Sequence, residues 1–311
     1  MEKIFVIGHQ KPDTDSIASA ISLSNLRNEL GDNTQGYRLG NVNKETAFAL
    51  KKFGMEAPEL LEEVEKDANV IMVDNNEFAQ SVKGIENANI KMIVDHHRVN
   101  LETTNPLYYI AEPVGCTNTI IYKLYKQNDV EIKPDMAGIM LSDIVSDTLL
   151  FKSPKCTEED KQVAEKLADI AGVDLYEYGQ ELLKAGTDIS DLTADEVLNV
   201  DCKPFEQNGV NFKIAQVNTA DLDDIFKRQE ELEAAINKDI QANNLGLYAF
   251  VATDIVNADS KVIVMGENAN VVEKAFDVQL DNNTAFLEGV VSRKKQVLPK
   301  ILDNLDGNMN L

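Results

Sequence analysis

The chain has 311 residues, of which 43% are hydrophobic and 27% charged, so it has the composition of a globular protein and the length for two domains. A formal net charge of -23 leaves no basic stripe for nucleic-acid phosphates, so we expect no nucleic-acid partner. No apolar run approaches the roughly 20 residues that span a bilayer, and the first residues lack a signal-peptide pattern. We therefore expect a cytoplasmic protein with no membrane partner.

The first half of the chain alternates short apolar runs with longer amphipathic segments. The apolar runs predict strands at 3–8, 35–39, 69–73, 91–94 and 108–110. The amphipathic segments predict helices at 17–30, 44–53, 117–127, 134–149, 158–171 and 175–184. This alternation predicts an α/β domain in which a parallel sheet is flanked by helices, with helices on both faces.

A second domain follows a polar segment near residues 185–190. We place the first domain at 1–186, a linker at 187–193 and the second domain at 194–311. The second domain is expected to have strands at 210–217, 247–254 and 261–265, a long helix at about 222–243, a short helix near 270 and a last helix after 292. These elements predict a smaller α/β domain with a mixed sheet.

All the histidines of the chain lie at the ends of predicted strands, beside aspartates. The groups are His9, Asp13 and Asp15 after the first strand, Asp74 after the third, and Asp95, His96 and His97 after the fourth. A single aspartate after a strand can simply cap the next helix. Three such groups favour a common site instead, because the carboxyl ends of parallel strands share one edge of the sheet.

The donor types at these strand ends indicate which metals the site would hold. Imidazole nitrogen and carboxylate oxygen without cysteine suit Mn²⁺, Co²⁺, Fe²⁺ or Mg²⁺. Asp13 and Asp15 alternate, so in an extended turn they would point to opposite sides and could serve different metal ions. Asp143 and Asp147 lie four residues apart on one helix face with no cationic neighbour in the local sequence. Asp147, nearer the helix end, is the preferred ligand of the two.

Two other features of the sequence bear on function. Cys116, Cys156 and Cys202 are odd in number and widely separated, which indicates free thiols. The segment Ser292-Arg-Lys-Lys-Gln296 places three cations at the start of a predicted helix, where they oppose the helix dipole. It is either a solvated basic turn or an anion-binding site, and the acidity of the chain favours the anion site. Lys203 is a weaker candidate for the same role.

These motifs resemble those of the manganese-dependent family II inorganic pyrophosphatases, in the DHH phosphoesterase superfamily. The resemblance covers essentially the whole chain and keeps the family's order and spacing. It is carried by Gly8-His-Gln-Lys-Pro-Asp-Thr-Asp-Ser16, Val73-Asp-Asn-Asn-Glu77, Asp95-His-His97, Ser146-Asp-Thr148 and Ser292-Arg-Lys-Lys-Gln296. The last motif is the most diagnostic, because other DHH phosphoesterases usually end in a glycine-rich motif.

The resemblance implies a role for each candidate residue. One metal would be held by His9, Asp13 and Asp74, and the second by Asp15, Asp74, His96 and Asp147, with Asp74 bridging. His97, Lys203, Arg293 and Lys294 would bind the substrate and act in catalysis, and Asp95 would support the site from behind. Asn75 departs from the family, many members of which have histidine there. This difference bears on metal affinity and preference.

The function implied by the resemblance is hydrolysis of pyrophosphate to two orthophosphates at a two-metal site between the domains. The cofactors would be two Mn²⁺ per subunit, with Co²⁺ or Mg²⁺ possible, and a further Mg²⁺ arriving with the substrate. Two metals can lower the pKa of a bridging water to about 7, and the hydroxide would attack phosphorus in line. The family resemblance also suggests a homodimer formed through the first domain.

Two other functions compete with this one. Another DHH enzyme, an exopolyphosphatase or a phosphodiesterase acting on short nucleotides, would use the same metal site with a larger pocket. A non-catalytic acidic protein would bind metal without releasing phosphate. Phosphate release from pyrophosphate, tripolyphosphate and a dinucleotide separates all three.

Overall fold

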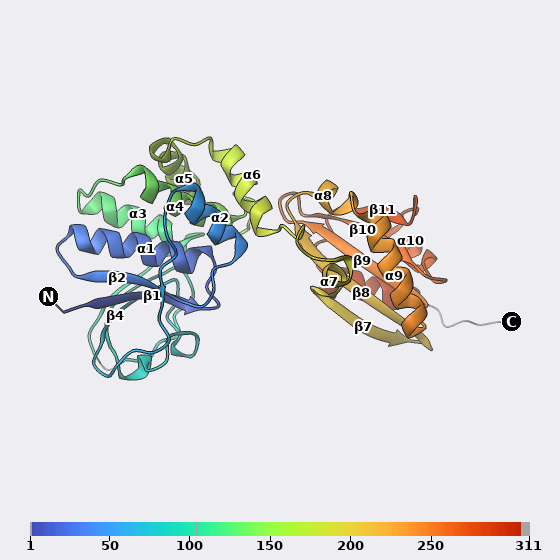
Figure 1. Ribbon diagram of the computed structural model, residues 1–311, viewed down its shortest axis with the longest axis horizontal. Helices are drawn as coiled ribbons and strands as arrows, with labels where there is room; N and C mark the ends of the chain where they lie inside the picture. Colours follow the sequence, from blue (N-terminus) through green and yellow to red (C-terminus); the bar gives the residue numbers. More distant parts are fainter. Residues whose placement is uncertain (1, 104, 306–311) are drawn as a thin grey trace. The chain divides into compact units, whose positions relative to one another are not determined.

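The computed structural model of the chain describes residues 2–103 and 105–305. The chain divides into two compact units, residues 1–186 and 187–311. Figure 1 shows the first unit in blue to yellow-green and the second in yellow to red. Both units are α/β, as the sequence predicts.

The first unit is built on a fully parallel six-stranded sheet. Its strands are β1 (Ile4–Gln10), β2 (Thr34–Leu39), β3 (Glu59–Leu60), β4 (Asn69–Val73), β5 (Asn89–Asp95) and β6 (Tyr108–Ala111), in the order β3-β2-β1-β4-β5-β6. The strand order runs outward from β1 in one direction and from β4 in the other. The boundary between β1 and β4 is therefore a switch point of the topology, where open parallel sheets bind their ligands.

The helices of this unit agree closely with the predicted ones. They are α1 (Thr14–Glu29), α2 (Lys44–Lys52), α3 (Thr117–Gln127), α4 (Pro134–Thr148), α5 (Glu158–Ala171) and α6 (Leu175–Gly186). Helix α1 packs closely on the sheet at Gly36, where an added Cβ would lie 2.8 Å from the Ala20 carbonyl oxygen. Figure 1 shows α1, α3, α4 and α5 on the same side of the sheet.

The expectation of helices on both faces is wrong for this unit. The opposite face of the sheet presents Ile7, Met72 and Ile93 to a core that receives no side chain from α1 to α6 in the described residues. That core is closed by loop residues such as Val64 and Val82 and by two 3-10 turns, η1 (Phe78–Gln80) and η2 (Ile85–Asn87). The connection between β4 and β5 forms these two 3-10 turns in place of an α-helix.

The second unit has a mixed five-stranded sheet with helices on both faces. Its strands are β7 (Cys202–Gln207), β8 (Val210–Thr219), β9 (Leu247–Asp254), β10 (Asp259–Met265) and β11 (Thr284–Leu287), in the order β11-β10-β9-β8-β7, and β8 and β9 form the one parallel pair among them. One face packs against α7 (Ala194–Asn199), α8 (Leu222–Phe226) and α9 (Gln229–Asn243). The other face packs against α10 (Asn270–Phe276) and α11 (Leu298–Asn304), which follows a π-helical turn, η3 (Arg293–Val297). Every residue of the central strand β9 is buried.

The long helix predicted at 222–243 is interrupted at Arg228. The guanidinium of Arg228 donates hydrogen bonds to the carbonyl oxygens of Ile189 and Leu192, at 3.2 and 2.8 Å. The backbone there leaves the helical region, with φ -102° and ψ 14°, and α9 starts afresh at Gln229. These contacts, and that of Ala220 N with Thr187 Oγ1, attach residues 187–193 to the second unit.

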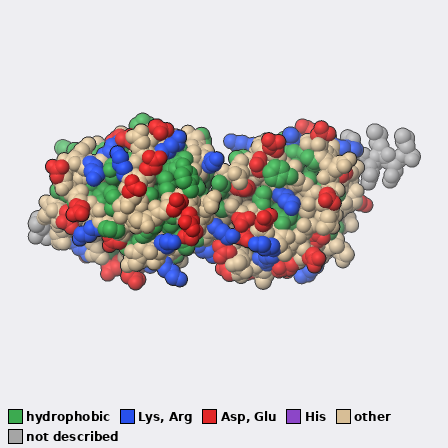
Figure 2. Space-filling model, turned by 90° about the horizontal axis from the view of Figure 1, so that it is seen from above, with side chains coloured by type: hydrophobic (Ala, Val, Ile, Leu, Met, Phe, Trp, Pro, Cys, Tyr) green, Lys and Arg blue, Asp and Glu red, His purple; other side chains and the backbone are tan. Residues whose placement is uncertain are grey.

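The surface is predominantly acidic, in keeping with the net charge. On the face that Figure 2 shows, Asp and Glu side chains are spread over both units with Lys and Arg between them. No helix in residues 2–103 and 105–305 is both long enough and apolar enough to cross a bilayer. The cysteines are free thiols, of which Cys116 is buried.

Candidate metal centre

The first strand and the turn after it position one histidine and two aspartates. His9 lies within β1, and its backbone N–H donates to Ser16 Oγ at 2.7 Å. Glycine is required at position 8, because an added Cβ would lie 1.8 Å from that Oγ. Asp13 caps α1 by accepting a hydrogen bond from Ser16 N at 3.0 Å, and Asp15 lies buried in the first turn. The turn therefore fixes both carboxylates relative to the imidazole.

The other candidates come from two more strand ends and from α4. Asp74 follows β4 in the left-handed region, with φ 52° and 3% exposure. Non-glycine residues that hold such conformations cluster at functional sites. His96 and His97 directly follow β5, and Asp147 lies in the last turn of α4. Residues distant in sequence thus meet at the carboxyl edge of the sheet.

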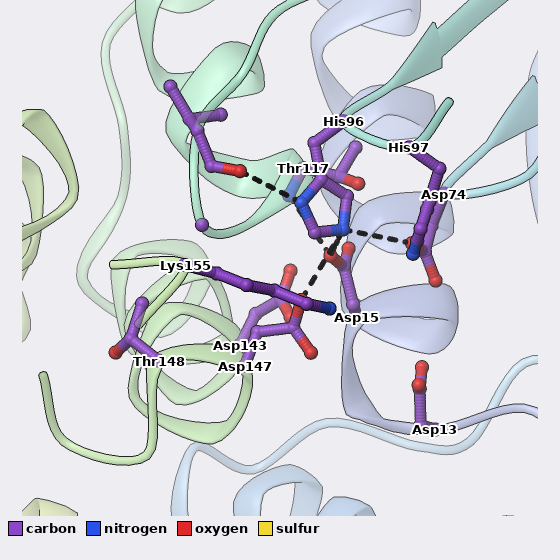
Figure 3. Close-up of polar contacts among 12 residues, drawn as sticks. Asp13, Asp15, Asp74, His96, His97, Thr117, Asp143, Asp147, Thr148 and Lys155 are labelled. Carbon is purple, nitrogen blue, oxygen red and sulfur yellow. Dashed lines mark hydrogen bonds and ion pairs between the residues drawn. The ribbon is translucent and has the colours of Figure 1, made fainter. Parts of the chain in front are cut away.

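These side chains form two groups that share Asp74, and Figure 3 shows the second, around His96. In the first group, His9 Nε2 lies 3.5 Å from Asp13 Oδ1 and 3.4 Å from Asp74 Oδ2. In the second, His96 Nε2 lies 3.5 Å from Asp74 Oδ1, 3.6 Å from Asp15 Oδ2 and 3.4 Å from Asp147 Oδ2. The two oxygens of Asp74 therefore face different histidines, as a carboxylate that bridges two cations must.

Unpaired buried atoms at this centre fit a metal ion. Asp74 Oδ1 and His96 Nε2 are both buried and have no hydrogen-bond partner among the described residues. Leaving such atoms unpaired costs about 1–3 kcal/mol each, so proteins seldom leave them without a purpose. A divalent cation between these atoms would satisfy both. Nitrogen and carboxylate donors, with no thiolate among those that surround His96, are the set that Mn²⁺ accepts.

The protonation of the cluster shows how strongly it attracts positive charge. Burial alone would lower the pKa of His9 and of His96, but contacts with Asp13 and Asp74 raise that of His9 to about 11, and Asp74 and Asp15 raise that of His96 to about 10. Burial and the charges of Asp15 and Asp74 raise the pKa of Asp147 to about 8. In neutral solution the metal-free cluster holds protons at these positions. Metal binding must displace them, because only the deprotonated groups are ligands.

A second layer of hydrogen bonds orients the imidazoles. His96 Nδ1 donates to the Val114 carbonyl oxygen at 3.0 Å, which directs Nε2 at the carboxylates. Asp95 is fully buried and accepts from the backbone N–H and from Nδ1 of His97, both at 3.0 Å. Burial would raise the pKa of Asp95, but its hydrogen bonds from His97 and Asn76 outweigh that effect and lower it. His97 itself stays 48% exposed and is free to meet a ligand.

Asn75 makes hydrogen bonds to its own turn. Its Oδ1 accepts from Glu77 N at 2.9 Å, and its Nδ2 donates to the Glu77 carbonyl oxygen at 3.3 Å. The residue lines the same cavity as the cluster, which has a volume of about 230 Å³. The amide thus stabilises the loop after Asp74 beside the metal centre.

Asp143 and Asp147 occupy different environments on α4. Asp147 faces His96, whereas Asp143 lies behind Asp15 and is fully buried. Asn118 Nδ2 donates to Asp143 Oδ2 at 2.6 Å, and Asp143 Oδ1 has no partner in the described residues. Burial and the charge of Asp15 hold the pKa of Asp143 well above its usual range. Asp143 therefore lies beside Asp15 and belongs to no group that contains an imidazole.

Sequence reasoning missed Glu45 on α2. Its Oε1 accepts a hydrogen bond from Thr14 Oγ1 at 2.6 Å and another, very short, from Ser146 Oγ. Thr14 stands between Asp13 and Asp15, and Ser146 precedes Asp147, so one carboxylate ties together two segments that carry candidate ligands. The hydroxyl residues beside the aspartates were the available signal. Their partner could not be found without the fold.

The second unit holds the cationic candidates. Lys203 on β7 and Lys294 in η3 are exposed. The Arg293 guanidinium lies 2.9 Å from Asp201 Oδ1, close to Lys203 along the chain. The turn is held by Gln296, whose Oε1 accepts from the backbone N–H of Val291 and Ser292 at 2.9 and 3.0 Å. The predicted helix start is thus a π-helical turn in which the glutamine side chain pairs the leading amides.

A larger cavity of about 770 Å³ lies at the other, amino-terminal edge of the first sheet. It is lined by Ile4, Leu26, Ile71, Tyr108 and other side chains, with no histidine among them. The switch-point cavity, although smaller, is where the histidines and aspartates meet. We therefore place the candidate active site in the smaller cavity.

Comparison with known proteins agrees with this geometry. Residues 3–144 match the family described as "DHH family, N-terminal domain", and residues 180–304 match the DHHA2 domain. The chain is 54% identical to a probable manganese-dependent inorganic pyrophosphatase of Bacillus velezensis and 53% identical to the manganese-dependent inorganic pyrophosphatase of Bacillus subtilis, each over 97% of this chain and 99% of the relative.

Solved structures give the same result. A putative family II inorganic pyrophosphatase of Methanococcus jannaschii is 42% identical, with a TM-score of 0.62 over 97% of this chain and 99% of that one. An exopolyphosphatase-related protein of Bacteroides fragilis, 15% identical with a TM-score of 0.51 over 97% of this chain and 92% of that one, shares the fold.

Proposed function

The chain belongs to the manganese-dependent (family II) inorganic pyrophosphatases, and we propose that it hydrolyses inorganic pyrophosphate to two orthophosphates at the centre built around Asp74. The observation that carries the proposal is the position of Asp74, whose two oxygens lie 3.4 Å from His9 Nε2 and 3.5 Å from His96 Nε2. A shared carboxylate of this kind is what a pair of catalytic metal ions requires.

The ligand sets follow the two groups of side chains. His9, Asp13 and Asp74 would hold one Mn²⁺, and Asp15, Asp74, His96 and Asp147 would hold the other. Four carboxylates balance the charge of two divalent ions, so the loaded centre is close to neutral and does not repel an anionic substrate. When bound, the metals supply positive charge and lower the pKa of water so that it is deprotonated at neutral pH.

The protein's own groups act on the phosphoryl oxygens. In the reaction, an oxygen from water bonds to one phosphorus, the bridging P–O bond breaks, and the leaving orthophosphate gains a proton. Arg293, Lys203 and Lys294 would stabilise the charge that develops on the oxygens, which is the largest contribution expected in phosphoryl transfer. His97 is oriented by Asp95 and would donate a hydrogen bond to the substrate.

The proposal extends to the assembly of the protein. It includes two Mn²⁺ per subunit with a further Mg²⁺ bound with the substrate, a homodimer formed through the first unit, and a cytoplasmic location. The names of the relatives support manganese. Metal analysis of protein purified without added metal tests the stoichiometry, and light scattering coupled to size exclusion tests the dimer.

Phosphate release is the direct test of the reaction. Pyrophosphate, tripolyphosphate and a short dinucleotide are each supplied with Mn²⁺ or Mg²⁺. We expect rapid release from pyrophosphate with Mn²⁺ and little from the others. Preference for tripolyphosphate or the dinucleotide would indicate another DHH phosphoesterase. Metal binding without phosphate release from any of the three would contradict the proposal that the protein is an enzyme.

A further inference from the structure

Lys155 is a cationic side chain at the metal centre that neither the sequence motifs nor the ligand sets include. It lines the cavity of about 230 Å³ together with His9, Asp74 and Asp147. Figure 3 shows its side chain extending from the loop after α4 toward Asp147. The residue belongs to the same unit as the proposed metal ligands, so its position there depends on that unit alone.

Lys155 is not a counterion of the carboxylates. No carboxylate oxygen of the described residues forms an ion pair with its ammonium group, whereas His9 and His96 make five such contacts with the same aspartates. Once two divalent ions balance the four ligand carboxylates, the charge of Lys155 is in excess. An unpaired ammonium beside a neutral metal pair attracts an anion. Lys155 and Arg98, which lines the same cavity, are both exposed, but the Arg98 guanidinium lies 3.8 Å from a Glu77 carboxylate oxygen.

A strained turn precedes Lys155 in the loop after α4. Leu149, Leu150 and Phe151 are three consecutive non-glycine residues in the left-handed region, with φ of 47°, 49° and 69°. Residues in such conformations persist only where the surrounding structure enforces them, and they cluster at functional sites. The turn directly follows the last turn of α4, which carries Asp147.

Contacts at both ends of this segment enforce the strain. Leu150 packs on α6 at Gly179, where an added Cβ would lie 2.5 Å from Leu150 Cδ1, and the rings of Phe151 and Tyr176 lie 6.3 Å apart. Farther along, Lys155 N donates to Ser153 Oγ at 3.3 Å, and Thr157 opens α5 with a capping box. The side chain thus starts from a fixed backbone.

We propose that Lys155 is a further substrate-binding residue, whose ammonium group binds a phosphoryl oxygen of pyrophosphate or of the orthophosphate product at the metal centre. The inference rests on the proposed function for its substrate and on the cavity for its position. It assigns one cationic contact to the metal-bearing unit itself, in addition to those proposed for the second unit. Ammonium groups bind phosphate as point charges and tolerate replacement by arginine better than by a neutral side chain.

The test compares three variants in the full-length protein. Lys155→Met removes the charge and keeps the length, Lys155→Arg keeps the charge, and Lys152→Met is the matched control. Lys152 is an exposed lysine of the same loop that does not line the cavity. Metal content is measured for each, followed by kcat, KM for pyrophosphate and the inhibition constant of orthophosphate at saturating Mn²⁺.

We expect Lys155→Met to lower kcat/KM and to weaken orthophosphate inhibition by roughly tenfold or more, the effect of losing one charged hydrogen bond. Lys155→Arg should recover most of the loss, and Lys152→Met should match the wild type. Equal kinetics of the two methionine variants at saturating Mn²⁺ would overturn the proposal. Inactivity of the wild type would instead refute the proposed function. Calorimetric titration of the metal-loaded variants with orthophosphate would then still decide whether Lys155 binds phosphate.

Discussion

The two units treat buried charge differently. In the first, Asp15, Asp74, Asp95, Asp143 and Asp160 are all almost fully buried, and two of them keep an oxygen without a partner in the described residues. In the second, Asp254 is the buried carboxylate among the described residues, and it accepts from the backbone N–H of Val256 and Asn257 at 2.8 and 2.9 Å. In the part of the chain that the structure describes, buried carboxylate oxygens without a partner are thus confined to the unit that would hold metal.

The difference reflects the separate requirements of residues that hold metal and residues that bind a substrate anion. Metal ligands must be fixed and desolvated before the ion arrives, so their unit carries unpaired donors and strained residues such as Asp74. A group that binds a substrate anion can stay hydrated until the substrate comes, and Lys203 and Lys294 are exposed. Stability and function therefore compete mainly in the first unit.

Replacing Asp74 by Asn tests the buried centre most severely. Asparagine tolerates the left-handed backbone of this position, so the loop should keep its shape while the charge shared by His9 and His96 is lost. We expect metal content to fall and phosphate release to drop by about 10³-fold or more, at or beyond the upper end for one electrostatic donor. Metal analysis and the pyrophosphate assay measure this, and normal metal content with normal turnover would contradict a bridging role.

The second test uses one capping box from each unit. Asp160 in α5 is buried and accepts four hydrogen bonds, from Gly115, Thr119 and twice from Thr157, whereas Glu196 in α7 accepts two from Thr193 at the surface. Asp160→Ala should destabilise its unit by about 3 kcal/mol or more, because buried donors are left unpaired. Glu196→Ala should cost far less.

Denaturant unfolding of both variants measures the comparison, with the transition of each unit fitted separately. The two capping boxes have nearly the same sequence signature. Equal losses in the free energy of unfolding would therefore show that burial does not determine how much each box stabilises its unit.

Arg293→Ala tests the cationic candidates of the second unit. Its side chain binds Asp201 within the second unit and no candidate metal ligand, so metal content should stay at the wild-type level. We expect kcat/KM to fall by about 10²-fold, by analogy with a lost oxyanion donor. Lys274→Ala, which removes an exposed cation from α10, serves as the control for net charge. Unchanged kinetics in Arg293→Ala would exclude the residue from substrate binding.

Glu45 offers the finest test, because it touches no candidate ligand directly. Glu45→Ala leaves the hydroxyls of Thr14 and Ser146 without their shared acceptor and should lower Mn²⁺ affinity by about 10- to 100-fold, as for other residues that support ligands. Glu45→Gln keeps an acceptor oxygen and should retain most of the affinity. Calorimetric Mn²⁺ titration measures both, and equal affinity of the alanine variant and the wild type would confine Glu45 to a structural role.

Local sequence patterns predicted most of the fold. Helices 117–127 and 158–171 and strands 69–73 and 247–254 have the predicted bounds, because apolar periodicity and capping residues act within a few positions. The break at Arg228 was missed. The side chain there contacts two carbonyl groups more than thirty residues away, and no local pattern indicates such contacts. That no α-helix of the described residues covers one face of the first sheet likewise depends on how loops fold back.

The sequence by itself determined which chemical groups the protein can bring to a metal, because all its histidines lie at the ends of strands or directly after them, beside aspartates, and parallel strands share an edge. It also determined the motifs by which the family is identified. Only the tertiary structure decided that the two oxygens of Asp74 face different histidines, that Glu45 links two ligand segments, and that Lys155 reaches the same cavity. Those relations join elements far apart in the chain, and long-range packing has no local pattern from which it could be read.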